Sequence, residues 1–216
     1  MPSRLTVPVL ENAVARLEPL SPRHLEGLRR AADAPRDSFA LTTVPTPATA
    51  EEYLRASLAR TDAGECWSLA QLDAATGEVV GHTSYLSPRW FPDGRLLAVE
   101  IGHTWLTPSV QGTAFNTAAK LLLAAHAFET WGVARLDLKT DARNARSRAA
   151  IQAIGARFEG VLRNWQPSAA EGEEGLPRDT AMHAITAADW PEVKRMLEQR
   201  LAAKLAAAQS APHPRT

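Results

Sequence analysis

The feature that most constrains the fold is a continuous passage from a strand, through a turn, into a long helix between residues 96 and 131. The apolar stretch Leu96–Leu106 predicts a strand, which ends at Pro108 because proline cannot donate a hydrogen bond to a strand ladder. Over residues 112–131 the apolar side chains recur on one helical face, and Gly132 ends the helix. Such a passage favours a sheet covered by helices.

Strand-like and helix-like segments continue through the rest of the chain. Short apolar or alternating runs predict strands at 14–17, 67–72, 79–86, 133–140, 156–164 and 181–186. Helix-start signals predict helices at 21–32, 49–60, 144–155 and from 189 onward. Proline-containing segments predict loops at 34–47 and 87–94. The expected fold class is α/β (mixed α+β), with one sheet and helices on its faces.

The length of the chain predicts one domain. A chain of 216 residues fits a single domain, which we expect to occupy residues 1–200. Residues 201–216 are mostly alanine and lysine, followed by Ser-Ala-Pro-His-Pro. That composition predicts a C-terminal tail that frays.

Charge, cysteine content and hydropathy exclude several classes of protein. Lys and Arg number 24, as do Asp and Glu, whereas a protein that grips nucleic acid needs a basic surface. The single cysteine, Cys66, allows no internal disulfide and fits a reducing compartment. The longest apolar stretch, Leu121–Phe128, is too short to cross a bilayer, and the dispersed histidines suggest no metal site. We therefore expect a cytoplasmic protein that uses no nucleic acid, membrane or metal.

The turn between the strand and the long helix has the composition of an anion site. A helix N-terminus carries free backbone amides and a partial positive charge. Small residues at Gly112 and Ala114 would let a bulky phosphate approach the backbone, and Gln111, Thr113 and Asn116 can add side-chain donors. An ordinary helix start with small residues has the same pattern, so the turn alone leaves both interpretations open.

The context of the turn resembles a known family. The segments "EIG…WL.P..QGTAFN", "TDARNARSRAAIQAIGA", "FEGVLR" and "RDT" together resemble the GNAT acetyltransferase superfamily, in particular its ribosomal-protein-acetyltransferase-like (RimJ/RimL-type) branch. The resemblance covers roughly residues 14–197. It implies an acetyl-CoA-dependent N-acetyltransferase built on a twisted mixed sheet of about six to seven strands, with helices on both faces.

The same resemblance implies how acetyl-CoA is held. The strands at 96–106 and 133–140 are expected to splay apart and hold the cofactor between them. Backbone groups of the first strand's end would pair with the pantetheine, namely those of Trp105, Leu106 and Thr107. Amides of the turn would bind the pyrophosphate, namely those of Gln111, Gly112, Thr113, Ala114, Phe115 and Asn116. One departure is Ala114, where this branch usually has glycine.

Two residues at the start of the next helix match the family's "N..S" pattern. The resemblance implies that Asn144 lies near the pantetheine amides and that Ser147 lies near the sulfur. A hydroxyl there can protonate or stabilise a departing thiolate. Many relatives use tyrosine for that purpose, but this chain has only Tyr53 and Tyr85, both elsewhere. Both Asn144 and Ser147 could instead serve as helix caps.

Acetyl transfer needs a base and a donor to the thioester carbonyl. The backbone amide of Leu106 is the expected donor, and Glu100 is the first candidate for the base, directly or through water. His103 is the next candidate on the same strand. In a regular strand Glu100 and His103 point to opposite faces, which makes them alternatives unless a bulge intervenes.

The acceptor is the least constrained partner. Aromatic side chains could form its binding wall together with His103, namely Phe39, Trp90 and Trp165. The acidic insertion at 171–175 could attract a cationic amine or be a solvated hairpin tip. The acceptor would be a primary amine, either a protein N-terminus or a small molecule. A non-catalytic acyl-CoA-binding module is the alternative function. The resemblance also allows a homodimer.

Overall fold

A computed structural model describes residues 5–210 of the chain. Its strands form one sheet in the order β1-β2-β3-β4-β5-β6-β8-β7. All neighbouring strands are antiparallel except β5 and β6, which are parallel, so the sheet is mixed as expected. The strands are β1 (Leu10–Glu11), β2 (Ala15–Pro19), β3 (Cys66–Asp73), β4 (Val79–Trp90), β5 (Leu96–Leu106), β6 (Arg135–Asp141), β7 (Arg157–Pro167) and β8 (Pro177–Thr186).

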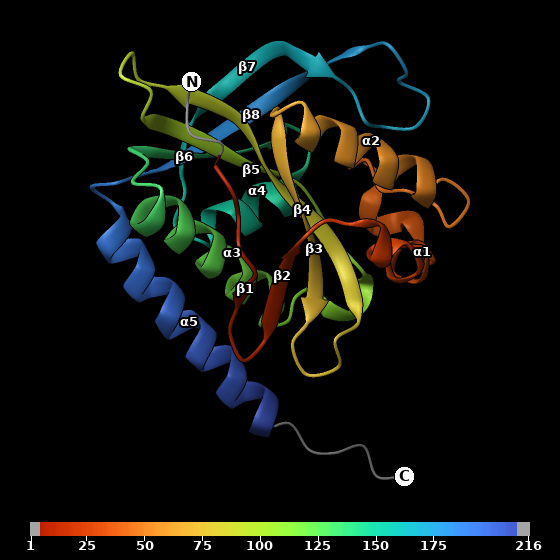
Figure 1. Cartoon of the computed structure of the whole chain (residues 1–216), viewed down its shortest axis with the longest axis horizontal. Helices are drawn as coiled ribbons and strands as arrows, with labels where there is room; N and C mark the ends of the chain where they lie inside the picture. The colour runs from red at the N-terminus through yellow and green to blue at the C-terminus, as the bar shows by residue number, and fades with distance from the viewer. Residues whose placement is uncertain (1–4, 211–216) are drawn as a thin grey trace.

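Helices cover both faces of the sheet (Figure 1). The helices are α1 (Leu25–Ala32), α2 (Ala50–Asp62), α3 (Phe115–Ala125), α4 (Ala145–Gln152) and α5 (Trp190–Ser210). On one side of the sheet, α1 and α2 pack over β3 and β4 and enclose an apolar core that includes Leu28 and Trp105. On the other side, α3 packs against α5 over a larger core that includes Leu106 and Leu123. Adjacent residues of β5 therefore face different cores, as strand geometry requires.

The sheet opens between its two central parallel strands. Only three residue pairs join β5 to β6, from Ala98↔Arg135 to Glu100↔Asp137. Beyond Glu100, β5 stays paired with β4 as far as Leu106, whereas β6 stays paired with β8 as far as Asp141. The carboxyl-terminal halves of β5 and β6 thus separate, as expected for the strands at 96–106 and 133–140.

The structure differs from the sequence prediction at several edges of the sheet. It has eight strands, because the two-residue β1 pairs with β2 without any sequence signal of its own. The loop predicted from residue 87 belongs to β4, which runs on to Trp90 through a register shift between Leu86 and Arg89. Ser87 there has φ +51°, an irregularity that is typical of a bulge. Because the segment also contains proline, its sequence pattern predicts a loop.

The C-terminal segment is helical where fraying was expected. Helix α5 continues without a break to Ser210, and residues 211–216 lie outside the described residues. Lys204 anchors this part of the helix, because its Nζ donates to the carbonyl oxygens of Gly112 and Thr113 at 2.7 Å each. Among residues 5–210, no helix is both long enough and apolar enough to cross a membrane.

Candidate functional site

A cleft of about 490 Å³ lies where β5 and β6 part. Residues 101–106 of β5 and 138–140 of β6 form its two strand walls. The turn before α3 and the first turns of α4 close one end, and the β7–β8 hairpin contributes residues 166–169 and Arg178. The loop between α1 and α2 covers the cleft with residues 38–39 and 41–43. Segments distant in sequence are thereby brought to one opening in the sheet.

The turn before α3 has the backbone of an anion site. Gly112 has φ +76°, which side-chain-bearing residues rarely adopt, and no neighbouring atom would meet a Cβ placed there. Ala114 precedes the first residue of α3 with φ −67° and ψ −21°, so alanine fits at this position without strain. Gln111, Gly112 and Asn116 line the cleft. Of the other predicted turn residues, Thr113 is exposed and the side chain of Phe115 is buried in the core.

A hydrogen-bond network holds the rim above this turn. Gln111 donates from Nε2 to the Leu106 carbonyl at 2.7 Å and to the Ser38 hydroxyl at 3.1 Å. Its Oε1 accepts from Arg146 at 3.2 Å, and Arg146 also donates to the Ser38 carbonyl. The α1–α2 loop, the turn and the start of α4 are therefore tied together at one end of the cleft.

Some backbone groups at the end of β5 are engaged within the fold. The Thr107 amide donates to the Val80 carbonyl at 2.8 Å, and the Trp105 carbonyl accepts from Gln71 Nε2 at 3.3 Å. Both groups are thus used inside the fold, whereas the Leu106 carbonyl is held by the Gln111 side chain. Neighbouring residues of a strand direct their backbone N–H and C=O groups to opposite edges of the strand. The backbone groups of Leu106 therefore face the opposite edge from those of Trp105 and Thr107.

A β-bulge interrupts β5 at His103. Gly102 pairs with Ser84 and Trp105 pairs with His82, so His103 and Thr104 together oppose the single residue Thr83. His103 has φ +49° and lines the cleft. The expectation that Glu100 and His103 point to opposite faces holds only for a strand without such a bulge. Reduced solvation of the ring, with the cations Arg60 and Lys139 nearby, lowers the pKa of His103 to about 4.

Glu100 lies before the bulge and is covered. It is only 4 % exposed, does not line the cleft, and pairs with Lys139 Nζ at 2.8 Å. Burial raises the pKa of Glu100, and the ion pair with Lys139 opposes that rise. A Cβ on Gly102 would lie 2.7 Å from Glu100 Oε1, so glycine at this position leaves room for the carboxylate.

The predicted pair at the start of α4 lines the cleft. Asn144 is the N-cap of α4, and its Oδ1 accepts from the Ser147 amide at 3.0 Å. Asn144 therefore caps the helix, and the cap uses only the oxygen of its side-chain amide. The Ser147 hydroxyl has no hydrogen-bond partner within residues 5–210, so it is free for a ligand.

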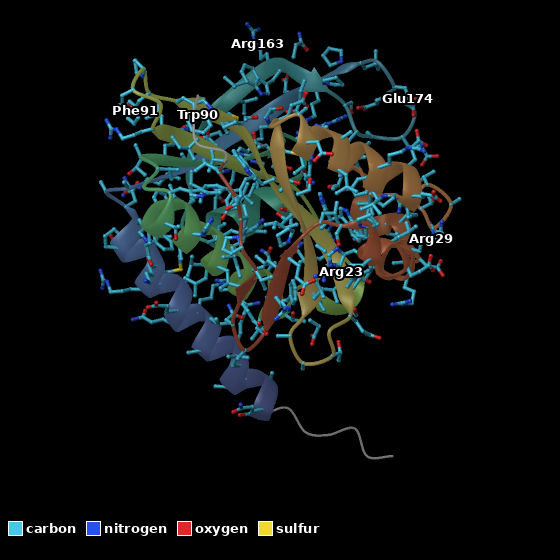
Figure 2. All side chains as sticks on the ribbon, in the orientation of Figure 1. Arg23, Arg29, Trp90, Phe91, Arg163 and Glu174 are labelled. Carbon is cyan, nitrogen blue, oxygen red and sulfur yellow. The ribbon has the colours of Figure 1, made fainter. Side chains whose placement is uncertain are left out.

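The predicted aromatic wall is only partly present. Phe39 is buried and lines the cleft. Trp90 lies at the far end of β4 (Figure 2), and Trp165 is 53 % exposed on β7; neither side chain lines the cleft. Trp165 lies in an irregular stretch of β7, where residues 163–165 oppose a single residue of β8, whereas the neighbouring Gln166 lines the cleft.

The acidic insertion also lies apart from the cleft. Glu173 pairs with Arg143 at 2.8 Å and accepts from the Ser168 hydroxyl at 2.6 Å. Glu174 lies on the hairpin loop between β7 and β8 (Figure 2), and none of the acidic residues at 171, 173 and 174 lines the cleft. These contacts stabilise the hairpin, and this segment contributes no acidic side chain to the cleft walls.

Four cationic residues of the cleft were not predicted from the sequence to be site residues, namely Lys120, Lys139, Arg146 and Arg178. Lys120 is 5 % exposed, and its Nζ donates to the Thr104 hydroxyl at 2.8 Å. Burial lowers the pKa of Lys120 to about 7. A lysine on the apolar face of the long helix was a usable signal for Lys120, because such positions are otherwise apolar.

Comparison with known proteins assigns the family. The family model described as "Acetyltransferase (GNAT) domain" matches residues 15–157. No curated protein matches the chain in sequence. A putative acetyltransferase from T. thermophilus is 31 % identical, with TM-score 0.76, covering 91 % of this chain and 99 % of that one. A GCN5-related N-acetyltransferase from Brucella melitensis is 26 % identical, with TM-score 0.79 and coverage of 92 % and 87 %.

A ribosomal-type structure shares the fold at lower identity. Mycobacterium smegmatis RimJ, in complex with CoA-disulfide, is 21 % identical, with TM-score 0.71 and coverage of 91 % and 93 %. The parted central strands, the glycine turn at a helix start and the matched family model agree with one another. This chain therefore belongs to the GNAT family of acetyltransferases, enzymes that take their acetyl group from acetyl-CoA.

Proposed function

We propose that this protein transfers an acetyl group directly from acetyl-CoA to a primary amine, either of a peptide N-terminus or of a small molecule. The observation that carries the proposal is the bulged strand β5, which parts from β6 beside a helix-start turn. Direct transfer asks the protein mainly to position two reactants, and one cleft that reaches both strands and the turn can do so.

The residues of the turn end fit the cofactor. An anion site at a helix N-terminus, an open glycine and the guanidinium of Arg146 suit a pyrophosphate. Apolar side chains suit the neighbouring pantetheine, namely Leu138, Ile151 and Ile154. The residues that would hold acetyl-CoA are Leu106, Gln111, Gly112, Thr113, Ala114, Phe115, Asn116, Asn144, Arg146 and Ser147. When bound, acetyl-CoA supplies the thioester carbonyl that the amine attacks.

Two groups of the chain would act on the reacting atoms. The Leu106 amide would donate to the carbonyl oxygen, where negative charge develops. The free hydroxyl of Ser147 would donate a proton to the leaving sulfur. The helix cap from Asn144 fixes the position of Ser147, because it holds the Ser147 backbone amide.

Two side chains are candidates for the base that deprotonates the amine. His103 lines the cleft and is neutral at neutral pH. Glu100 is buried, and burial raises its pKa. Its ion pair with Lys139 links it to the cleft, because Lys139 lines the cleft. The pH dependence of kcat separates them: the variant that abolishes the acidic limb of the profile, Glu100→Gln or His103→Gln, identifies the base.

A thiol-release assay tests the proposed reaction. Acetyl-CoA is incubated with a panel of primary amines and N-terminal peptides, and free thiol is measured against a no-acceptor control. Thiol release with a matching acetylated product supports the proposal. Binding of acetyl-CoA without release from any acceptor would instead support a non-catalytic acyl-CoA-binding module.

The cellular setting belongs to the same proposal. The one free cysteine, Cys66, is buried and fits a reducing cytoplasm. The homodimer stays a prediction, and light scattering coupled to size-exclusion chromatography tests it.

A further inference from the structure

The cleft is cationic although the whole chain has a net charge of zero. Its described lining contains no Asp or Glu. It does contain four permanently or partly charged bases, namely Lys120, Lys139, Arg146 and Arg178. A cleft of this charge would repel a polyamine and favour an acceptor that carries a negative group.

Three of these cations already have partners or lie at the cofactor end. Lys139 pairs with Glu100 at 2.8 Å. Arg146 donates to Gln111 and to the α1–α2 loop beside the turn. Lys120 is a buried residue of α3 and donates to a hydroxyl of β5. Only the fourth cation, on the hairpin side of the cleft, still needs a partner.

Arg178 is that unpaired cation. It is the second residue of β8, opposite Gln166 of β7, and both residues line the cleft with the hairpin segment 167–169. Arg178 is half-buried, its Nε is out of contact with solvent, and its guanidinium makes no hydrogen bond or ion pair within residues 5–210. The Nε of Arg178 has thus lost hydration without gaining a partner that would compensate for it.

The nearest carboxylates cannot satisfy Arg178. Asp141 and Glu100 lie close enough to favour its charge electrostatically, yet neither is within ion-pair distance. Asp141 is held by Arg143 at 2.7 Å, and Glu100 is held by Lys139 at 2.8 Å. Both carboxylates are therefore engaged with other cations, and Arg178, which lines the cleft, has neither of them as an ion-pair partner.

We propose that Arg178 binds a carboxylate of the acetyl acceptor, so the acceptor is a primary amine that also carries an acidic group. The guanidinium fork matches a carboxylate in bidentate geometry, which gives orientation as well as attraction. The inference rests on the proposed acetyl transfer to an amine. The shared chemistry can come from a small amino acid or from a peptide with an acidic side chain near its N-terminus.

The test compares matched acceptors and matched variants in the thiol-release assay. The acceptors are aspartate and glutamate, their diamides, N-terminal peptides with Glu or Gln at the second position, and spermidine. The variants are Arg178→Gln, Arg178→Lys and the control Arg163→Gln, which removes an exposed arginine of β7 that does not line the cleft (Figure 2). Calorimetry measures acetyl-CoA affinity, and thermal melting checks the fold.

We expect the wild type to prefer a carboxylate-bearing acceptor over its amide. Arg178→Gln should lower kcat/KM for that acceptor by roughly ten- to hundredfold, the size of a lost charge-assisted hydrogen bond pair, and leave the amide unchanged. Arg178→Lys should recover part of the loss, because it keeps the charge without the fork. Acetyl-CoA affinity should stay at the wild-type value. The small acids and the peptides distinguish the two sources of the carboxylate.

Three results would overturn the inference while leaving the proposed reaction intact. These are preferred turnover of spermidine or of the amides, an equal loss on acid and amide in Arg178→Gln, and weakened acetyl-CoA binding in that variant. Absence of thiol release from every acceptor, with acetyl-CoA still bound, would overturn the proposed function and this inference with it.

Discussion

The two ends of the cleft are built in different ways. At the turn end, residues 111–116 lie consecutively at a helix start, and the site is local in sequence; the amides of Gln111 and Phe115 bond within the turn, to Pro108 and Thr113. At the hairpin end, His103, Lys139 and Arg178 come from β5, β6 and β8 and act through side chains. A site made of backbone suits one unvarying ligand, whereas a site made of side chains can change its ligand by substitution. Under the proposed function, the turn end would bind the common donor and the hairpin end the specific acceptor.

The largest expected effect breaks the turn end alone. Gly112→Val places a side chain at φ +76°, in the space that a phosphate would occupy. We expect acetyl-CoA affinity to fall by at least about a hundredfold, because steric exclusion and a shifted backbone remove several hydrogen bonds together. Calorimetry measures the affinity.

Gly64→Val is the matched control for this substitution. Gly64 has φ +75° and equally open surroundings, but it lies outside the cleft. Both variants should lose similar thermal stability, and only Gly112→Val should lose binding. Equal acetyl-CoA affinity in the two variants would refute the turn as the pyrophosphate site.

The second effect concerns Lys120, a cation buried within the turn-end wall. Burial lowers its pKa from 10.5 to about 7. The unfolded chain therefore binds more protons than the folded one between these values, so the free energy of unfolding rises with pH in that window. The expected slope is at most ~1.4 kcal/mol per pH unit.

Lys120→Met should remove this slope and stabilise the protein below pH 7, where the wild type must bury a charged amine. Urea unfolding of both proteins at pH 6, 8 and 10 measures the difference. Parallel stability curves for the wild type and the variant would show that the amine is not titrating in this window.

A smaller effect sharpens the boundary between the two ends. Ser147→Ala removes a hydroxyl with no protein partner among the described residues and keeps the backbone amide that Asn144 caps. We expect kcat to fall about tenfold and acetyl-CoA affinity to fall less than kcat, because the leaving sulfur loses a donor. Steady-state kinetics and calorimetry separate the two quantities.

Asn144→Ala provides the comparison for Ser147→Ala. It removes the cap, so it should cost about 1 kcal/mol of stability, whereas Ser147→Ala should cost little. An unchanged kcat in Ser147→Ala would leave the serine with no role in the transfer.

The smallest effect tests how α5 supports the turn. Lys204→Met removes the donor to the Gly112 and Thr113 carbonyls and should weaken acetyl-CoA binding about threefold, since one exposed charged contact is lost. Lys194→Met, on the same helix but paired with Glu129, should leave the affinity unchanged. Equal affinities in both variants would show that the turn holds its shape without α5.

Much of the turn end could be predicted from the sequence, and little of the hairpin end could. Gly112, Asn116, Asn144 and Ser147 line one cleft, and each belongs to a short motif at a helix start; their roles there stay predictions. Trp90 and Trp165 were chosen for the acceptor wall by residue type, and neither lines it. The burial of Glu100 depends on contact with β6, and the bulge at His103 depends on pairing with β4. The sequence of β5 alone does not predict either feature.

The sequence by itself determined the order of strands and helices, the glycine turn and the helix caps, because these follow from backbone preferences over a few neighbouring residues. The tertiary structure alone decided that β5 and β6 part after Glu100, that α5 is anchored by Lys204, and that Arg178 is left without an acid among the described residues. Each of these depends on which charges and hydrogen-bonding groups find partners far along the chain. Those pairings are fixed only when the whole sheet has formed.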